Sequence, residues 1–478
     1  MFIGRTYELE QLNEMKKSSR AELVVVYGRR RVGKSALLEQ IIQGSEDYFF
    51  EAVKGLTKKK QISHFLKQLE EMTRTKMTIA SSWQEAFDQL TPHIESGAHT
   101  LIFDEFPWMA SEKIELVSIL KYYWDRKWKK NSELKLVLCG SVANYMIKHL
   151  IHSEALHNRK TLEMKIDPLS ANEAKLFFKN KRSLFEICKF LMIFGGIPKY
   201  LEQTNPNLSF EQNLDKLCFM KNSFFTNEFE TVFKEQFKTI KKYEPIVQIL
   251  SAGKKTKEDL QTQTQSTRGG GFGTLLHKLE MAGFISKEIS LNFEVGRRKS
   301  RTQKYTLCDE WLKFYLTYMK KNSRLIQNQT SAGLSGRLIG NSLPSYLGLF
   351  FETFCQKNIT QIIKSLNIEP ATIIDIGPYF RQSSKNKGGK PLNKKNQGVQ
   401  LDLCIVRKGR IITAIECKFK ESSVGTDVIK EMDDKIAKLN LAKNITLERV
   451  LISASGVTPE VEASDYFHRI LGLEAIFN

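Results

Sequence analysis

The chain has 478 residues, a formal net charge of +20 and hydrophobic side chains at 41% of its positions. One hydrophobic core stops growing at about 250–300 residues, so this length predicts several domains. No apolar run approaches the roughly 20 residues that span a bilayer, so we expect no membrane span. The basic excess favours a polyanionic partner, nucleic acid before an acidic membrane surface, unless it reflects only a lysine-rich proteome.

Cysteine usage bears on the cellular compartment. The seven cysteines occur singly, and no two of them form a CxxC pair. Most lie inside apolar runs, where a thiol behaves as a small hydrophobe. The odd number and the lack of a secretory leader predict a soluble protein in a reducing cytoplasm.

The clearest local pattern lies between Val24 and Gln40. An apolar, β-branched run ends at Gly28, the residues RRRVGKS follow, and an amphipathic helical pattern then begins. A buried strand, a glycine-containing loop and a helix in this order form a P-loop, whose backbone amides hold phosphates at the helix start. Lys34 adds a charge for the β- and γ-phosphates, and the Ser35 hydroxyl can ligate Mg²⁺. We therefore expect ATP and Mg²⁺ as cofactors. The expected nucleotide contacts in this stretch are Gly28, Arg31, Gly33, Lys34, Ser35 and Ala36.

Polar residues follow two further apolar strands. Asp104 and Glu105 end the first, and ligands bind at the carboxyl ends of strands in open α/β sheets. Beside a P-loop, Asp104 would hold Mg²⁺ and Glu105 would polarise the water that attacks the phosphate. Ser141 follows the second strand. It either senses the γ-phosphate or marks a plain turn from strand to helix.

Strands and helices alternate between residues 20 and 168. The expected strands lie at 23–27, 47–52, 101–103, 134–139 and 161–166. This alternation predicts an α/β fold with a parallel, doubly wound sheet. From residue 170 to about 243 the pattern turns helical, opened by a capping box of Ser170 and Glu173 and interrupted by the turn GGIPKYL.

The first half of the chain resembles the AAA-like P-loop ATPases of archaea and bacteria that are related to the signal-transduction (STAND) ATPases. The resemblance rests on FIGRTYELEQL, GRRRVGKS, LIFDEF, LCGS, RKTLEMKIDPLS and GGIPKYL. It implies that Gly4 and Arg5 lie against the adenine, and that a helical lid carrying Pro198 closes over the nucleotide. By position, Arg159 is the first choice for an arginine finger or lid sensor.

Residues 241–319 show three short helical patterns and an expected hairpin. The helices are expected at 245–250, 256–261 and 272–282, and the hairpin strands at 286–293 and 303–307. With a basic hairpin tip, GRRKSR, this is the pattern of a winged helix. As a DNA reader, the third helix would offer Arg268, Thr274, His277 and Lys278, and the tip would meet phosphates. The alternative is a winged helix used only for packing or autoinhibition.

A polar stretch at residues 322–341 contains three glycines and is typical of a domain boundary. Beyond it we expect an amphipathic helix with Glu352 and a strand at 372–377. The loop at 381–398 has six basic residues and no acid. It is either a solvated insert or a segment that tracks phosphates.

The strands after this loop carry a second chemical pattern. Asp402 lies on one expected strand, and Glu416 and Lys418 lie on its hairpin partner. Because side chains alternate along a strand, Glu416 and Lys418 share a face and Cys417 points to the opposite, buried one. With Glu352, these residues resemble the PD-(D/E)xK nuclease core, although a leucine precedes the first acid where that family usually has proline. The resemblance implies that the three acids hold Mg²⁺ and that Lys418 orients or activates the attacking water.

We expect four domains: a P-loop ATPase domain at 1–169, a helical lid at 170–240, a winged helix at 241–321 and a nuclease-like domain at 342–478. The leading hypothesis is an ATP-dependent protein that cleaves DNA. The second is a STAND-type switch that assembles several copies of the chain, with a C-terminal domain that only binds DNA or a partner. The third is a DNA-binding regulator that acts through the winged helix alone.

Overall fold

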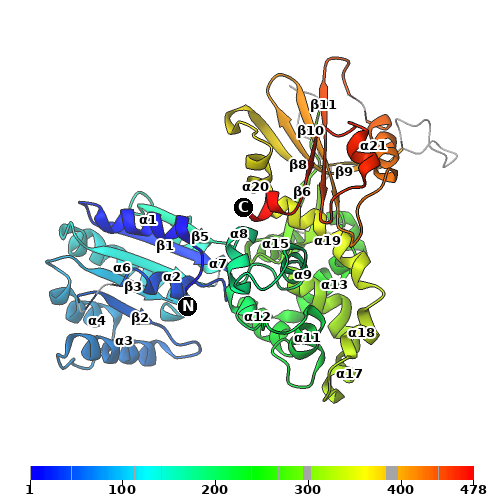
Figure 1. Cartoon of the computed structure of the whole chain (residues 1–478). Helices are drawn as coiled ribbons and strands as arrows, with labels where there is room; N and C mark the ends of the chain where they lie inside the picture. The colour runs from blue at the N-terminus through cyan, green and yellow to red at the C-terminus, as the bar shows by residue number, and fades with distance from the viewer. Residues whose placement is uncertain are drawn as a thin grey trace. The chain divides into compact units, whose positions relative to one another are not determined.

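The computed structural model describes residues 2–478 except 43, 45, 112–113, 142, 238, 267–269, 294–302, 384–396 and 440. The chain divides into two compact units (Figure 1). Unit 1 comprises residues 1–169, 197–199 and 232–238, and unit 2 comprises the remainder. Among the described residues, no helix combines the length and the apolar character that crossing a bilayer would require.

Unit 1 is built on a parallel five-stranded sheet with the order β2-β3-β4-β1-β5, which confirms the predicted α/β sheet. Its strands are β1 (Glu22–Gly28), β2 (Tyr48–Glu51), β3 (Thr100–Asp104), β4 (Lys135–Gly140) and β5 (Leu162–Ile166). Its helices include α1 (Thr6–Lys17), α2 (Lys34–Glu39), α3 (Lys58–Thr73), α4 (Trp83–Leu90), α5 (Phe106–Met109), α6 (Glu115–Arg126) and α7 (Ala143–Met146).

Both faces of this sheet are covered by helices, which explains why its strands read as continuous apolar runs. Val24 and Val26 of β1 pack with α1 and α2 on one face. Leu23 and Val25 pack with the aromatic side chains of α3, α4 and α6 on the other. Burying each such side chain stabilises the fold by roughly 1.5–3 kcal/mol. The sheet is therefore a rigid support for the loops at its carboxyl edge.

Residues 170–242 are largely helical, as expected, and the capping box of Ser170 and Glu173 is present. The helices here are α8 (Ala171–Ala174), α9 (Leu184–Phe194), α10 (Pro198–Leu201), α11 (Phe210–Leu214) and α12 (Glu228–Gln236). The division between the units passes through α10 and α12. That this region forms a nucleotide lid stays a prediction.

Three helices and a hairpin follow in the predicted order. They are α13 (Glu244–Ser251), α14 (Lys257–Gln263), α15 (Gly270–Met281), β6 (Ile285–Ile289) and β7 (Gln303–Leu307). Thr274 and His277 are exposed on α15, whereas Arg268 and the basic tip lie outside the described residues. The assignment as a winged helix stays a prediction.

The first hairpin strand is shorter than predicted, because the chain leaves it at Ile289 and joins the C-terminal sheet. The Leu291 amide donates to the Pro378 carbonyl at 3.0 Å. The Ser290 hydroxyl donates to the Phe380 carbonyl at 2.7 Å and accepts from its amide at 2.9 Å. Leu291 is buried in the core of that sheet. The expected strand at 286–293 was therefore wrong beyond Ile289, since its last residues find apolar partners in another sheet.

The stretch expected as a polar linker is also helical. It contains α17 (Ser323–Asn328) and α18 (Leu334–Ile339), and Leu334 and Ile339 are buried. The Asp215 carboxylate accepts from the amides of Gly333 and Ser335 at 2.7 and 2.8 Å, which satisfies the start of α18. The expected polar linker thus contains two helices, and a domain boundary near residue 342 stays a prediction.

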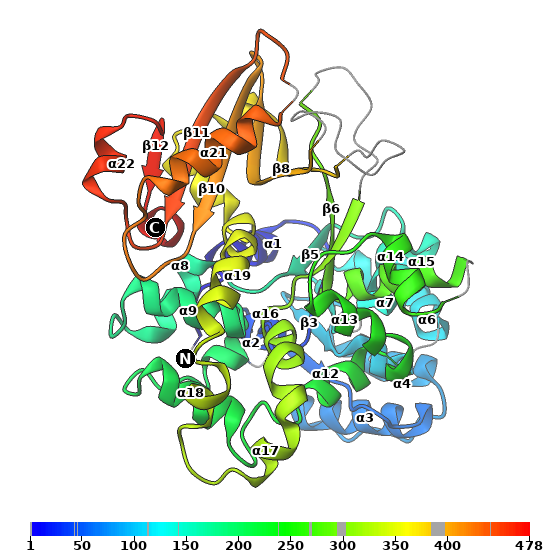
Figure 2. The same cartoon turned by 90° about the vertical axis from the view of Figure 1, so that its right-hand side faces the viewer.

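The C-terminal sheet has the order β12-β11-β10-β9-β8. Its strands are β8 (Ile373–Arg381), β9 (Val399–Arg407), β10 (Ile411–Lys418), β11 (Thr446–Ser453) and β12 (Arg469–Leu471). The surrounding helices are α16 (Glu310–Phe314), α19 (Leu343–Lys357), α20 (Ile359–Ser365), α21 (Asp427–Ala437), α22 (Pro459–Ala463) and α23 (Glu474–Phe477). Strands β8, β9 and β10 are antiparallel, and β10, β11 and β12 are parallel. Figure 2 shows α21 crossing this sheet, where Val428 and Met432 enter its core.

Candidate functional sites

The loop between β1 and α2 has the backbone geometry of a phosphate-binding loop. A Cβ at Gly28 would lie 2.3 Å from the carbonyl oxygen of Ile166, so no side chain fits there. Gly33 has a φ of 89°, in the left-handed region that favours glycine. Arg31 adopts a φ of 70° in the same loop. The two glycines are therefore needed for the chain to turn from the strand into the helix.

Lys34 is held inside this loop by backbone carbonyls. Its side chain is 5% exposed, and its ammonium donates to the carbonyls of Gly28 at 3.1 Å and Arg29 at 3.0 Å. An ammonium has three donors, so this arrangement leaves one for an anion. A nearly buried lysine whose ammonium is bound by backbone carbonyls fits a site for phosphate, which would supply a negative charge.

Acidic and hydroxyl side chains meet at the adjacent ends of β3 and β4. The Ser35 hydroxyl donates to Asp104 Oδ2 at 2.5 Å, and Asp104 is 2% exposed. The Ser141 hydroxyl donates to Glu105 Oε2 at 2.8 Å. Strand β4 lies between β1 and β3, so the four residues share one edge of the sheet. Mg²⁺ binds through one or two carboxylates together with substrate phosphates, and the oxygens of Ser35 and Asp104 fit that requirement.

The remaining predicted nucleotide residues surround this loop. The Arg5 guanidinium donates to the carbonyls of Val32 at 2.9 Å and Asp167 at 2.6 Å, so it ties the N-terminal segment to the loop. A Cβ at Gly33 would lie 3.7 Å from Pro198 Cγ. Pro198 is thus beside the loop, as the lid hypothesis requires. Direct contact of Gly4, Arg5, Ala36 or Pro198 with a nucleotide stays a prediction.

The sequence analysis did not include Gln236, and the structure gives Arg159 a carboxylate partner. The Gln236 side-chain amide donates to the Ser141 carbonyl at 2.8 Å. No local sequence motif predicts this contact. The Arg159 guanidinium instead binds both oxygens of Asp125 at 2.8–3.0 Å. This ion pair lowers the pKa of Asp125, with the Arg159 hydrogen bond as the main cause. Arg159 is therefore held by Asp125 in this structure, and its role as a finger or sensor stays a prediction.

The second site lies on β9 and β10. As the alternation predicts, Glu416 and Lys418 share a face, with Lys418 Nζ 3.1 Å from Glu416 Oε1. Cys417 is buried on the opposite face, where a hydrogen bond with the Cys355 thiol and burial raise its pKa. Asp402 Oδ2 accepts from the Cys417 amide at 3.1 Å. The strand register therefore brings the predicted acids and lysine together.

Helix α21 adds two charged residues that the sequence analysis did not include. Lys435 Nζ lies 2.6 and 2.7 Å from the two oxygens of Glu416 and 4.0 Å from Asp402 Oδ1. Glu431 Oε2 lies 2.5 Å from Lys418 Nζ. The sequence did contain a signal for these two residues. Glu431 and Lys435 are four residues apart, and they follow the apolar Val428 and Met432 by three residues each, so they lie near the face of the helix that packs on the sheet.

The fourth predicted residue, Glu352 on α19, lines a cavity together with Asp402. Its Oε2 accepts from the Gln400 amide at 3.3 Å. A cavity of about 450 Å³ is lined by Glu352, Asp402, Glu431, Lys435 and five neighbouring residues. Across the described residues, no three His, Cys, Asp or Glu side chains are gathered closely enough to hold a metal ion. Instead, Lys435 and Lys418 both form ion pairs with Glu416.

The electrostatics of this acidic cluster (Glu352, Asp402 and Glu416) follow from its burial. Burial, reinforced by the carboxylates of Glu416 and Glu352, raises the pKa of Asp402 to about 7. Burial also raises the pKa of Glu352. Burial alone would lower the pKa of Lys418, but its contacts with Glu431 and Glu416 outweigh this and raise it. The cluster is therefore a desolvated acidic site in which Lys418 is charged.

Two protein families match separate parts of the chain. Residues 2–204 match a family described as an ATPase domain predominantly from Archaea. Residues 2–204 carry a P-loop ATPase domain. Residues 315–430 match a family of archaeal and bacterial proteins of unknown function.

Individual similar proteins include two from Methanocaldococcus jannaschii. An uncharacterized protein is 27% identical over 386 residues, which are 80% of this chain and 83% of that protein. An uncharacterized ATP-binding protein is 39% identical over 46 residues, which are 10% of this chain and 78% of that protein.

Solved structures similar to this chain include one from Pyrococcus abyssi and one from Aeropyrum pernix. A Walker-type ATPase of Pyrococcus abyssi has a TM-score of 0.48 and 17% identity, covering 66% of this chain and 96% of that one. The ORC2 protein of Aeropyrum pernix, in ADPNP-ADP complexes, has a TM-score of 0.44 and 13% identity, covering 68% of this chain and 94% of that one.

Proposed function

We propose that this protein binds and hydrolyses ATP and acts on DNA, and that its ATPase domain controls Mg²⁺-dependent phosphodiester cleavage by the C-terminal domain. The observation that carries the ATPase part is the meeting of Lys34, Ser35, Asp104 and Glu105 at one edge of the unit 1 sheet. A bound Mg²⁺ would polarise the phosphate that is attacked.

Each residue of the ATPase site has a distinct task in this proposal. Lys34 turns from the loop carbonyls to the β- and γ-phosphates and neutralises their charge. Ser35 and Asp104 present two adjacent oxygens to the metal. Glu105 orients the attacking water. The Ser141 hydroxyl, which follows β4, donates a hydrogen bond to Glu105, so a change in the position of Ser141 would alter the position of the Glu105 carboxylate.

The acidic cluster supports the cleavage part of the proposal. Asp402 and Glu416 are nearly buried on adjacent strands, and Lys418 stands beside Glu416 as a charged group. Carboxylates of this kind are the ligands that Mg²⁺ prefers. In this structure, however, the Lys435 ammonium donates to both carboxylate oxygens of Glu416. Cleavage therefore requires Lys435 to withdraw from Glu416 before a metal ion can be held there.

The same contact favours a second function, a STAND-type nucleotide switch. The positive charge of Lys435 offsets the negative charge of Glu416 without a metal ion. Such an arrangement suits a domain that binds DNA or a partner and does not cleave. Residues 290–293, at the base of the expected wing, are also paired with β8 and packed in the C-terminal core. That pairing suits a wing used for packing, which the switch hypothesis allows.

DNA cleavage by the full-length protein separates the two functions. Supercoiled plasmid is incubated with Mg²⁺ and ATP and with wild type, Lys418→Ala or Lys408→Ala. Lys408 is exposed at the β9–β10 turn and serves as the matched lysine control. Nicking by wild type and Lys408→Ala but not by Lys418→Ala supports cleavage. No nicking by any protein, or undiminished nicking by Lys418→Ala, rejects it and leaves the switch.

A further inference from the structure

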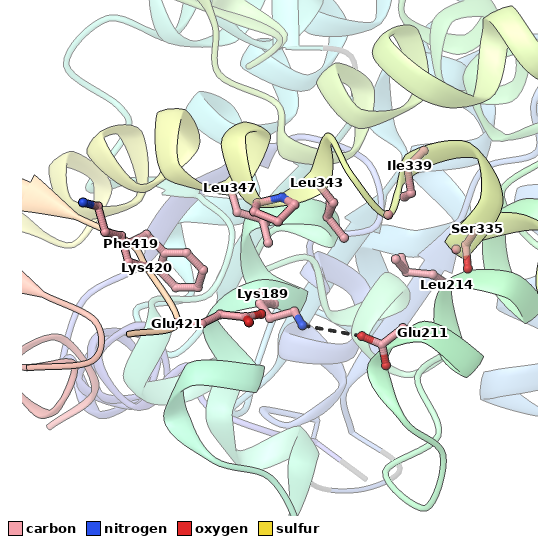
Figure 3. A pocket seen from close by; sticks show the side chains of 13 residues that line it. Lys189, Glu211, Leu214, Ser335, Ile339, Leu343, Leu347, Phe419, Lys420 and Glu421 are labelled. Atoms are coloured by element: carbon pink, nitrogen blue, oxygen red, sulfur yellow. Dashed lines mark ion pairs between the residues drawn. The ribbon is translucent and has the colours of Figure 1, made fainter. Parts of the chain in front are cut away.

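A pocket in unit 2 lies away from both sites described above. It has a volume of about 160 Å³ and is enclosed by α9, α11, α18, α19 and the segment that follows β10 (Figure 3). Its apolar walls are formed by Leu214, Ile339, Leu343, Leu347 and Phe419. Apolar cavities of about 150 Å³ hold molecules the size of benzene. The pocket is therefore large enough for a small organic ligand.

Ser335 gives the first sign of a ligand. Its side chain is 2% exposed, and its hydroxyl oxygen has no hydrogen-bond partner within the part of the chain that the structure describes. The Ser335 amide, by contrast, is satisfied by Asp215. Leaving a buried hydroxyl unpaired is unfavourable, so such groups are rare without a functional reason. Ser335 lines the pocket, where a ligand oxygen would complete its hydrogen bonding.

Lys189 gives an independent second sign. Its side chain is only 15% exposed, and its nearest carboxylate is that of Glu211 at 3.6 Å. The Glu211 side chain is 61% exposed, and ion pairs with such solvated partners contribute little. The Lys189 ammonium also lies 4.2 Å from the ring centroid of Phe210. A largely buried ammonium with these weak partners favours a negatively charged group in the pocket.

Figure 3 shows how these groups are arranged. Lys189 extends toward Glu211, while Leu343 and Leu347 descend from α19 and Ser335 lies beside Ile339. We propose that this pocket binds a small amphipathic acid, with an apolar body of roughly benzene size, a carboxylate that pairs with Lys189 and an oxygen that accepts from Ser335. Phe419 directly follows Lys418 in the chain, so the pocket shares a backbone segment with the acidic cluster.

The binding of phenylpropionate to the full-length protein tests this proposal without reference to ATP hydrolysis or DNA cleavage. Phenylpropanol is the neutral counterpart with the same apolar body, and acetate supplies the charge alone. Isothermal calorimetry should show phenylpropionate binding at least about tenfold tighter than phenylpropanol, a preference that one well-paired charge readily supplies. Acetate should not bind. Equal binding of the acid and the alcohol, binding of acetate alone, or no binding at millimolar concentration overturns the proposal.

Variants distinguish a ligand site from residues that only support the fold. Lys189→Gln should abolish the preference for the acid over the alcohol. Glu211→Gln should tighten acid binding severalfold, because it removes the carboxylate that competes for Lys189. Ser335→Ala should weaken binding without lowering the melting temperature of the ligand-free protein. Unchanged affinity in either Glu211→Gln or Ser335→Ala overturns the proposal, even if Lys189→Gln fails to fold.

Blocking the pocket gives a final check. A Cβ built at Gly336, on α18, meets no atom within 4 Å, and its φ is not in the left-handed region. Gly336→Phe can therefore place a ring at the pocket without backbone strain. It should abolish phenylpropionate binding and leave the melting temperature of the free protein within a few degrees. Full binding by a folded Gly336→Phe variant overturns the location of the site.

Discussion

The ATPase site and the acidic cluster balance their charges in different ways. In unit 1, the Lys34 ammonium donates to two carbonyls of its own loop, and these neutral groups leave its positive charge available to an anion. In unit 2, Glu416 is already bound by Lys435, a side chain from α21. In the proposed function, phosphate would replace backbone carbonyls around Lys34, whereas a metal ion at Glu416 would have to displace Lys435. We therefore expect nucleotide binding to require less rearrangement than metal binding at the acidic cluster.

The largest expected effect comes from removing the loop cation. Lys34→Ala leaves the phosphates without their charged partner, so ATP hydrolysis should fall about 100-fold or more. Phosphate release measured at saturating ATP checks this, with Lys59→Ala as the control because Lys59 is exposed on α3. Retained hydrolysis in Lys34→Ala would mean that another site in the chain hydrolyses ATP.

The backbone of the loop can be tested separately from its charge. Gly28→Val places side-chain atoms against the Ile166 carbonyl and should lower the free energy of unfolding by about 1–3 kcal/mol or more. Gly273→Ala is the matched control, since its Cβ would meet only the Lys257 ammonium at 3.6 Å on a helix. Urea denaturation should show the control as stable as wild type or slightly more so. Equal stability of Gly28→Val and wild type would contradict the described loop.

Lys435 and Mg²⁺ should compete for the carboxylate of Glu416. Lys435→Gln removes one of the two lysines that contact Glu416, so Mg²⁺ affinity should rise about tenfold, equivalent to about 1.4 kcal/mol. Lys430→Gln is the control, because Lys430 is exposed on the same helix and lies outside the lining of the cavity. Calorimetric titration with Mg²⁺ measures the difference. Unchanged or weaker Mg²⁺ binding in Lys435→Gln would show that Lys435 does not compete with the metal.

The buried acid also predicts a pH dependence of stability. The pKa of Asp402 is about 7 in the folded chain and about 3.9 in an unfolded one, so the folded state binds more protons between these values. The contribution of Asp402 to stability is therefore present at low pH and is lost as pH rises toward 7. Asp402→Asn, which cannot ionise, should flatten this fall by about 1 kcal/mol or more. Parallel stability profiles for both proteins would contradict the shifted pKa.

Local patterns predicted the first site better than the second. The strand, loop and helix around Lys34 lie within seventeen consecutive residues, so the sequence alone defines their geometry. The strand order could not be read this way, because the placement of β4 between β1 and β3 depends on contacts far apart in sequence. The pairing of Lys435 with Glu416 depends likewise on how α21 packs, which a nineteen-residue separation does not determine.

The two corrected elements have related causes. The residues after Ile289 continue a strand-like pattern, and their hydrophobicity does not reveal which sheet will bury them. At residues 322–341, glycine and polar composition concealed two helices, one of which Asp215 stabilises from more than a hundred positions away. Both involve long-range partners. Local composition therefore does not identify partners that are distant in sequence, nor the elements that those partners stabilise.

The central claim is that the ATPase domain controls cleavage of DNA. The most direct measurement is the rate of plasmid nicking in Mg²⁺, with and without ATP, for wild type and Lys34→Ala. The account predicts that ATP accelerates nicking by wild type and leaves Lys34→Ala unaffected. Equal nicking rates with and without ATP in both proteins would contradict it.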